Sequence, residues 1–213
     1  MKKLKIYLET TIFNFVFADD SPDKKQDMLK LFEEIDQGEY ILYTSDYALK
    51  ELEEAGKVKK ARIFDLIEQY QIIVLKPDKN AEILADKYIN ENIIPEKYRT
   101  DGLHIAIATI NDLDIIFSHN SKHILKLKTI MGAESINLRE GYNPIIIHSP
   151  TAVMTMTESE LKIIDEIHAI REQLYEETKD MTPEERTKYH NDRAREIIKK
   201  YNLEAQFVKS PTQ

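Results

Sequence analysis

The chain has 213 residues, of which 42% are hydrophobic and 32% charged, and a formal net charge of −8. This length suits one medium domain with an appendage, or two small domains. No apolar run approaches the roughly 18 residues that a membrane helix needs, and the absence of cysteine excludes disulfides and thiolate zinc sites. We expect a cytoplasmic protein without a membrane partner. Because the net charge is negative, a nucleic acid could bind only at local basic patches of the surface.

Five short apolar runs alternate with amphipathic stretches over the first 150 residues. The runs are rich in β-branched residues and predict strands at 4–8, 40–44, 71–75, 114–118 and 144–148. The stretches predict helices at about 24–37, 46–69 (two helices, broken near Gly56), 78–91 and 100–112. Strands that alternate with helices predict an α/β domain over residues 1–150, with a central parallel sheet covered on both faces.

A separate helical tail is predicted over residues 151–213. Thr157-Glu158-Ser159-Glu160 has the form of a capping box and predicts a helix from about 158 to 178. Thr182-Pro183-Glu184-Glu185 is a second capping box, which predicts a helix to about Tyr201. The first helix has one apolar face, made by Ile163, Ile167, Ile170 and Leu174. Two helices bury little apolar surface alone, so the tail must dock on its own domain, a second subunit or another protein.

Side chains with oxygen donors follow several predicted strands. Glu9 and Thr10 end the first strand, Glu51 lies on the helix after the second, Asp101 opens the helix at 100–112, and Asn120 follows the fourth strand. In open parallel sheets the carboxyl ends of the strands bind ligands at one edge. Such a cluster suits Mg²⁺ or Mn²⁺, which can activate water and neutralise charge on a phosphodiester.

Four segments in order resemble the motifs of the PIN-domain (VapC-like) ribonuclease family. They are Ile6-Tyr7-Leu8-Glu9-Thr10-Thr11-Ile12-Phe13-Asn14, Ser45-Asp46-Tyr47-Ala48-Leu49-Lys50-Glu51-Leu52, Asp101-Gly102-Leu103-His104-Ile105-Ala106-Ile107-Ala108 and Ser118-His119-Asn120-Ser121-Lys122-His123-Ile124. The resemblance covers about residues 4–150. It implies a PIN-like three-layer fold, an RNA substrate, and Mg²⁺ or Mn²⁺ bound by the equivalents of Glu9, Glu51 and Asp101.

The segments depart from the family pattern at two positions. Glu9 stands where aspartate is commoner, and Asn120 stands where aspartate is frequent, which removes one negative charge. Both residues also occur within the family, so the resemblance still implies an active site with Asn120 as a further ligand. The departures leave the metal affinity and the number of ions open.

Each candidate also has a structural interpretation. Glu9 could be a solvated surface carboxylate, and Glu51 part of an acidic helix face. Asp101 suits a helix N-terminus and Asn120 a turn. Thr10 is expected either to hold Glu9 or a metal-bound water, or to cap a helix.

The histidines and basic residues near the predicted site are less informative. We expect His104 to be a packed, hydrogen-bonded structural histidine, while His119 and His123 lack the spacing of a zinc site. Basic residues that could contact phosphate groups are equally consistent with ordinary solvated helix faces; they are Lys57, Lys59, Lys60, Arg62, Lys122, Lys126 and Lys128.

Part of the tail, about 35 residues beginning near Ile167, resembles the short helical antitoxins that accompany PIN toxins. A tethered helix docks at high effective concentration, and an arginine could replace the metal among the carboxylates. The candidates are Arg171, Arg193 and Arg195. Dimerisation or simple packing on the domain are the alternatives.

Two functions follow from these patterns. The first is a metal-dependent endoribonuclease that is a component of a toxin–antitoxin system and carries a fused self-inhibitory helical tail. The second is a catalytically weak or inactive PIN-fold binding module, a homo-oligomer whose tail mediates assembly. A phosphoryl-transfer or receiver-like protein is disfavoured, because neither an Asp-x-Asp-x-Thr signature nor a Gly-rich phosphate loop is present.

Overall fold

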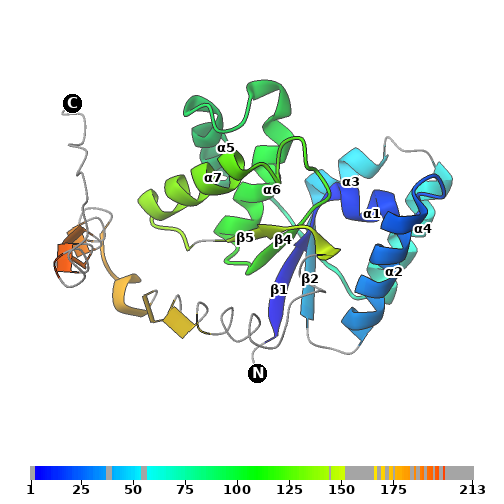
Figure 1. The fold of residues 1–213 in the computed structure, drawn as a ribbon, viewed down its shortest axis with the longest axis horizontal. Coiled ribbons are helices and arrows are strands. Elements are labelled where there is room, and N and C mark those ends of the chain that lie inside the picture. Colours follow the sequence, from blue (N-terminus) through cyan, green and yellow to red (C-terminus); the bar gives the residue numbers. More distant parts are fainter. Residues whose placement is uncertain are drawn as a thin grey trace.

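The computed structural model of the chain is an α/β domain followed by a tail (Figure 1). It describes residues 3–36, 40–53, 57–143 and 145–151, and then single residues and short stretches between 166 and 199. Three of the predicted features, at Gly56, at Pro144 and at the capping box that begins with Thr157, lie outside the described residues.

A five-stranded, all-parallel sheet forms the centre of the domain. Its strands, in the spatial order β3-β2-β1-β4-β5, are β1 (Leu4–Leu8), β2 (Tyr40–Ser45), β3 (Ile73–Leu75), β4 (Ile115–Phe117) and β5 (Ile146–His148). The predicted α/β class with a parallel sheet is therefore confirmed. The last three strands are shorter than predicted because each pairs over only three residues, as β3 does from Tyr43↔Ile73 to Ser45↔Leu75.

Helices cover both faces of the sheet, as the alternation of strands and helices predicts. The helices of the domain are α1 (Thr10–Val16), α2 (Pro22–Asp36), α3 (Asp46–Glu53), α4 (Lys57–Gln69), α5 (Lys79–Asn90), the 3₁₀ helix η1 (Glu96–Tyr98), α6 (Arg99–Ile110) and α7 (Leu127–Arg139). The four predicted helical stretches are present with small shifts at their ends.

Sequence analysis did not predict α1, η1 or α7. The seven residues of α1 are mostly β-branched or aromatic, and such residues favour strands. In α7, Leu127 and Met131 are 70% and 60% exposed, whereas Ala133 and Ile136 are buried. The apolar residues of α7 therefore do not follow one stripe, and the usual periodic signal of an amphipathic helix is weak.

The core consists of two clusters, one on each face of the sheet. On β1 the side chains alternate, so Tyr7 joins the cluster formed with α5, α6 and α7, while Ile6 and Leu8 join the cluster formed with α1, α2 and α4. Every residue of α6 from Gly102 to Thr109 is buried. This helix is apolar all round because neighbouring elements surround it, so any polar group on it needs a partner inside the protein.

Four helices end in the same backbone motif before the chain turns toward the next element. After α4, α5, α6 and α7, one residue adopts a left-handed conformation: Gln71 (φ 50°), Asn92 (φ 57°), Asp112 (φ 51°) and Gly141 (φ 81°). At the first of these, Ile72 N–H donates to Ile67 O at 2.9 Å and Gln71 N–H donates to Glu68 O at 3.2 Å. This is the Schellman pattern, in which glycine avoids the steric cost of a Cβ.

Replacement of Gln71 by Gly is expected to raise the free energy of unfolding by about 0.5–1 kcal/mol, because the left-handed conformation strains any residue with a Cβ. Gln71 is exposed, so the change removes no packing. The control is Gln71→Ala, which keeps the strain and should give no gain. Urea denaturation of the three proteins checks this, and equal stability of the glycine and alanine variants would contradict it.

The tail keeps the second predicted capping box. Thr182 N–H donates to Glu185 Oε2 at 2.8 Å, and Glu185 N–H donates to Thr182 Oγ1 at 3.3 Å. In Figure 1 the described tail residues lie on the side of the molecule away from α1 and α3.

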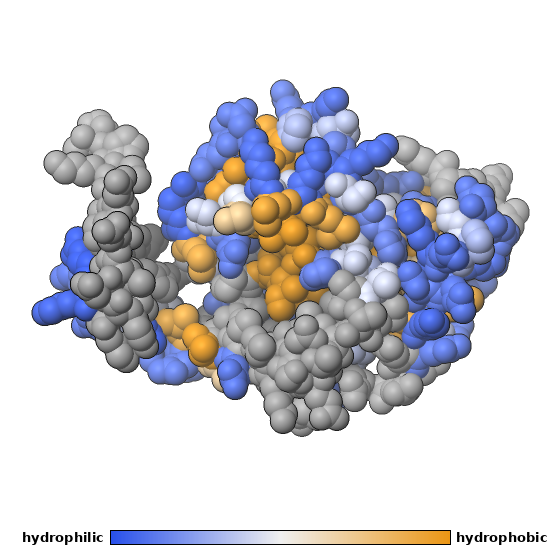
Figure 2. All heavy atoms as spheres, viewed as in Figure 1, coloured by the Kyte–Doolittle hydropathy of each residue, from blue (hydrophilic) through white to orange (hydrophobic). Residues whose placement is uncertain are grey.

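Figure 2 shows hydrophobic side chains gathered at the centre of one face, over the region of β4 and β5. None of the described helices has the length and apolarity to cross a membrane.

Candidate metal centre

The order of the sheet reverses between β1 and β4, and Glu9 lies at this point. The chain passes from β1 to β2 and β3 on one side, and then to β4 and β5 on the other. The crevice at the carboxyl ends of the strands where the order reverses is the usual ligand site of such sheets. Glu9 N–H donates to Phe117 O at 3.1 Å, so the end of β1 is held beside the end of β4.

Glu9 is 3% exposed, which rules out a solvated surface carboxylate. It is the N-cap of α1 and accepts hydrogen bonds from the Thr11 N–H at 3.1 Å, from the Thr11 hydroxyl, and from the Ser118 hydroxyl at 2.9 Å. The Thr11 hydroxyl in turn accepts from His119 N–H at 2.8 Å. Thr10 is expected to hold Glu9 or a metal-bound water, or to cap a helix; of these, the contact with Glu9 is made by Thr11 instead.

Thr10 instead donates its hydroxyl hydrogen to Glu51 on α3. The same oxygen of Glu51, Oε2, lies 3.0 Å from His104 Nε2. The other ring nitrogen of His104 lies 2.8 Å from the Tyr7 hydroxyl, which is itself 2.7 Å from Ser45 Oγ. His104 is therefore buried and hydrogen-bonded through both nitrogens, as expected, and it ties α6 to β1 and α3 beneath the site.

Asp101 lies in the first turn of α6, three residues before His104 and on the same side of the helix. Its Oδ1 accepts a hydrogen bond from Asn120 Nδ2 at 3.0 Å. The oxygen of the Asn120 amide accepts from His123 N–H at 3.1 Å, and the backbone N–H of Asn120 donates to Ser118 Oγ at 2.9 Å. Asn120 thus holds Asp101 with its nitrogen, while its oxygen is already engaged in the loop.

The charges of these groups act on one another. Burial raises the pKa of Asp101 to about 6; the nearby His104 works against this, and the negative charges of Glu9 and Glu51 add to it. Burial opposes the charge of Glu51 too, but the hydrogen bonds from His104 and Thr10 and the charge of His104 outweigh it, so the pKa of Glu51 is lowered.

For His104, burial favours the neutral ring, yet the hydrogen bond to Glu51 and the charges of Glu9, Glu51 and Asp101 together raise its pKa. Glu9, Glu51 and Asp101 thus influence one another's charge, and His104 lies among them.

One oxygen of each carboxylate is anchored and the other is not. No described residue donates a hydrogen bond to Oε1 of Glu9, Oε1 of Glu51 or Oδ2 of Asp101, whereas the second oxygen of each group has one to three donors. Carboxylate ligands of metals are held by hydrogen bonds in this way. The donor set therefore fits a hard divalent cation. Within the described part of the chain, however, no three acidic or histidine side chains converge closely enough to hold an ion as they stand.

Two of the three candidate arginines pair within the tail. Arg193 contacts Glu177 at 3.0 Å and the Tyr189 hydroxyl at 2.6 Å, and Arg195 contacts Asp192 at 3.1 Å, so both pair within the tail. Arg171 lies outside the described residues, as do the side chains of Lys57 and Lys59.

The roles of Tyr7, Thr11, Ser45 and Ser118 were not predicted from the sequence, although all four lie inside the four motifs. A polar residue within or directly after a buried strand was the available signal for Tyr7, Ser45 and Ser118, and no such signal marks Thr11, which lies in α1. Nearby, the ring of His119 packs edge-on against Phe15 with centroids 5.1 Å apart. Its Nε2 is the one buried side-chain nitrogen or oxygen without a hydrogen-bond partner in the described residues.

No protein-family model matches the chain, and no curated protein matches its sequence.

Proposed function

We propose that the chain is a Mg²⁺- or Mn²⁺-dependent endoribonuclease with a PIN-like fold. The observation that supports this most directly is the common arrangement of Glu9, Glu51 and Asp101. Glu9 follows β1, Glu51 lies on α3 after the neighbouring strand β2, and Asp101 lies in the first turn of α6. Each is fixed through one oxygen while the other has no described donor. The pKa of Asp101 is raised by burial and, to a smaller extent, by the negative charges of Glu9 and Glu51, and a divalent cation would offset both.

In this proposal the three carboxylates hold the ion, and their neighbours keep them in position. Thr10 and His104 fix Glu51, and Asn120 fixes Asp101. Asn120 then acts through Asp101 rather than as a ligand, because its own oxygen accepts from the loop. A bound Mg²⁺ or Mn²⁺ would neutralise charge on the phosphodiester and lower the pKa of a water molecule.

The test compares Glu51→Gln with Glu134→Gln, a matched change at an exposed position on α7. We expect wild type and Glu134→Gln to bind Mn²⁺ in calorimetry and to cleave labelled single-stranded RNA, and chelation to stop the cleavage. Glu51→Gln should bind Mn²⁺ at least about tenfold more weakly, since removing a charged ligand or its support costs about 10- to 100-fold in affinity. RNA left intact by metal-bound wild type would refute the nuclease.

The second candidate is a PIN-fold binding module that assembles through its tail or as a homo-oligomer. It is favoured by the absence, within the described residues, of three acidic or histidine side chains poised around one point. The same calorimetry separates the two, because a binding module should take up no Mn²⁺ at millimolar concentration. A self-inhibitory tail gains no support from Arg193 or Arg195, which pair within the tail, so Arg171 is the remaining candidate.

A further inference from the structure

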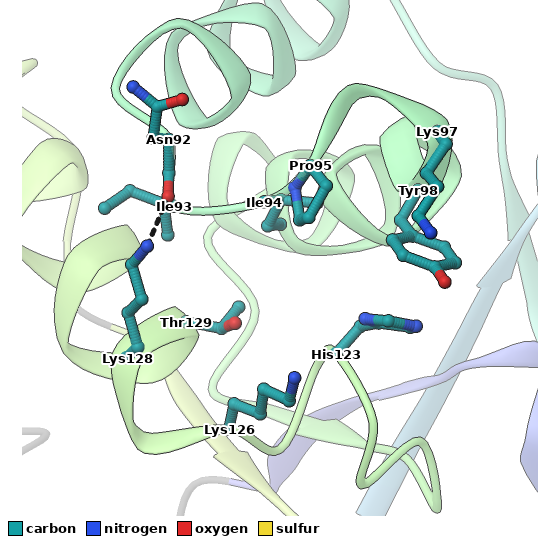
Figure 3. Close-up of a pocket in the computed structure, with 10 residues that line it drawn as sticks. All are labelled: Asn92, Ile93, Ile94, Pro95, Lys97, Tyr98, His123, Lys126, Lys128 and Thr129. Atoms are coloured by element: carbon teal, nitrogen blue, oxygen red, sulfur yellow. Dashed lines mark hydrogen bonds between the residues drawn. The ribbon is translucent and has the colours of Figure 1, made fainter.

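A pocket lies beside the carboxylate cluster, between the segment that links α5 to α6 and the start of α7 (Figure 3). Its volume is about 360 Å³, within the range of roughly 300–1,000 Å³ that small ligands occupy. The walls come from residues 92–95, Lys97 and Tyr98 on one side and from His123, Lys126, Lys128 and Thr129 on the other.

The lining of this pocket is basic. It includes Lys97, Lys126 and Lys128 and no aspartate or glutamate, although the chain as a whole carries a net charge of −8. Lys128 donates to Asn92 O at 2.7 Å and so joins the two walls. Figure 3 shows the amine of Lys126 pointing into the space between the walls. An anionic group would find positive charge on both sides of the pocket.

The pocket also has a flat aromatic wall. The rings of Tyr98 and His123 stack with centroids 3.5 Å apart and an angle of 28° between their planes. The amine of Lys97 lies 4.7 Å from the centre of the Tyr98 ring. Desolvation, and then the positive charges of Lys126 and Lys97, lower the pKa of His123, which favours the neutral ring.

Two short links connect the pocket to Asp101. His123 N–H donates to the Asn120 oxygen at 3.1 Å, and Asn120 donates to Asp101 at 3.0 Å. On the other wall, Tyr98 is the N-cap of α6, in whose first turn Asp101 lies. A phosphodiester backbone with one phosphate in the basic pocket would therefore have its next phosphates near the carboxylates.

We propose that this pocket binds one nucleotide of a single-stranded RNA next to the phosphodiester at the carboxylate cluster. Lys97 and Lys126 contact the phosphate, and the outer face of the His123 ring, whose other face stacks on Tyr98, stacks on the adjacent base. Such stacking accepts any base, whereas the lysines respond only to the backbone. The choice of RNA as the ligand rests on the proposed function, but the basic and aromatic lining is independent of it.

The test measures binding without metal, so that it does not depend on cleavage. Fluorescence anisotropy with a labelled single-stranded RNA in a chelator compares wild type, Lys97→Ala/Lys126→Ala, Tyr98→Ala and the control Lys30→Ala/Lys79→Ala. The control removes two exposed lysines from α2 and the start of α5. We expect the slope of log affinity against log salt to fall by about 0.7 in the pocket variant, because both lysines contact the same phosphate.

Tyr98→Ala should weaken binding about tenfold and leave the salt slope unchanged. Thermal melts confirm that each variant is folded. Wild type that binds no RNA, or a pocket variant whose slope equals that of the control, overturns the proposal. Metal-dependent cleavage with no effect of the pocket variants would refute the pocket alone. RNA binding that needs the pocket, without cleavage by wild type, would refute the nuclease alone.

Discussion

Replacement of Asp101 by Asn is expected to lower metal-dependent RNA cleavage by about 10²–10³-fold and at the same time to stabilise the metal-free protein at neutral pH. The loss of activity has the size found when one group that stabilises transition-state charge is removed. The gain in stability arises because Asp101 is partly buried beside Glu9 and Glu51, which disfavour its charge. Asparagine has no charge to bury, and its carbonyl oxygen can still accept from Asn120.

The pH dependence of this gain follows from the direction of the shift. The pKa of Asp101 is about 6 in the folded protein, against 3.8 as the ordinary value, so the folded state binds this proton more tightly than the unfolded state. Wild type therefore loses stability relative to the variant as the pH rises from about 4 to about 6. Because the group is partly solvated, we expect the full difference above pH 6 to be about 1 kcal/mol.

Urea denaturation in a chelator at about pH 3.5, 5 and 7.5 measures this difference. The control is Asp65→Asn, at an exposed position on α4, which should change the stability by less than about 0.5 kcal/mol at every pH. Mn²⁺ should then stabilise wild type more than Asp101→Asn, since the ion binds the carboxylate form. A variant that is less stable than wild type at pH 7.5, or a gain in stability that does not vary with pH, would show that the folded protein does not disfavour the charged form of Asp101.

Replacement of His104 by Ala is expected to destabilise the protein by about 2–4 kcal/mol. It would leave a cavity in the core and remove the partners of Tyr7 and Glu51 at the junction of β1, α3 and α6. The control is His148→Ala on the edge strand β5, where the side chain is exposed and a change within about 0.5 kcal/mol is expected. Denaturation of both variants at pH 6 and at about pH 9 provides the measurement.

The effect of His104→Ala should be largest at low pH. The folded-state pKa of His104 is raised, so its charged form contributes stability that is fully present below the ordinary value of 6.5. This contribution is lost as the pH rises through the folded-state pKa, and the gap between variant and wild type should narrow. A gap that widens with rising pH would mean that His104 is neutral in the folded protein.

Local patterns were sufficient for the framework of the site. Glu9 and Asp101 could be selected because one follows a strand and the other opens a helix whose type is set by nearby residues, and Glu51 because it lies in the second of the four motifs. The contacts of Thr10 and Thr11 could not be assigned, because the choice depends on which residue begins α1. That helix has little intrinsic propensity and depends on its cap and on burial of Ile12 and Phe13.

The sequence by itself determined the five strands, the four periodic helical stretches and the parallel class of the sheet, because short β-branched runs and helical spacing are properties of neighbouring residues. Only the tertiary structure decided the strand order, the helix α7 and the partners of the polar groups. The hydrogen bond between Tyr7 and His104 joins residues 97 apart, and that between Ser118 and Glu9 joins residues 109 apart. Such contacts depend on how the whole sheet is assembled, so no local pattern predicts which oxygen of a carboxylate is anchored and which is left for a ligand.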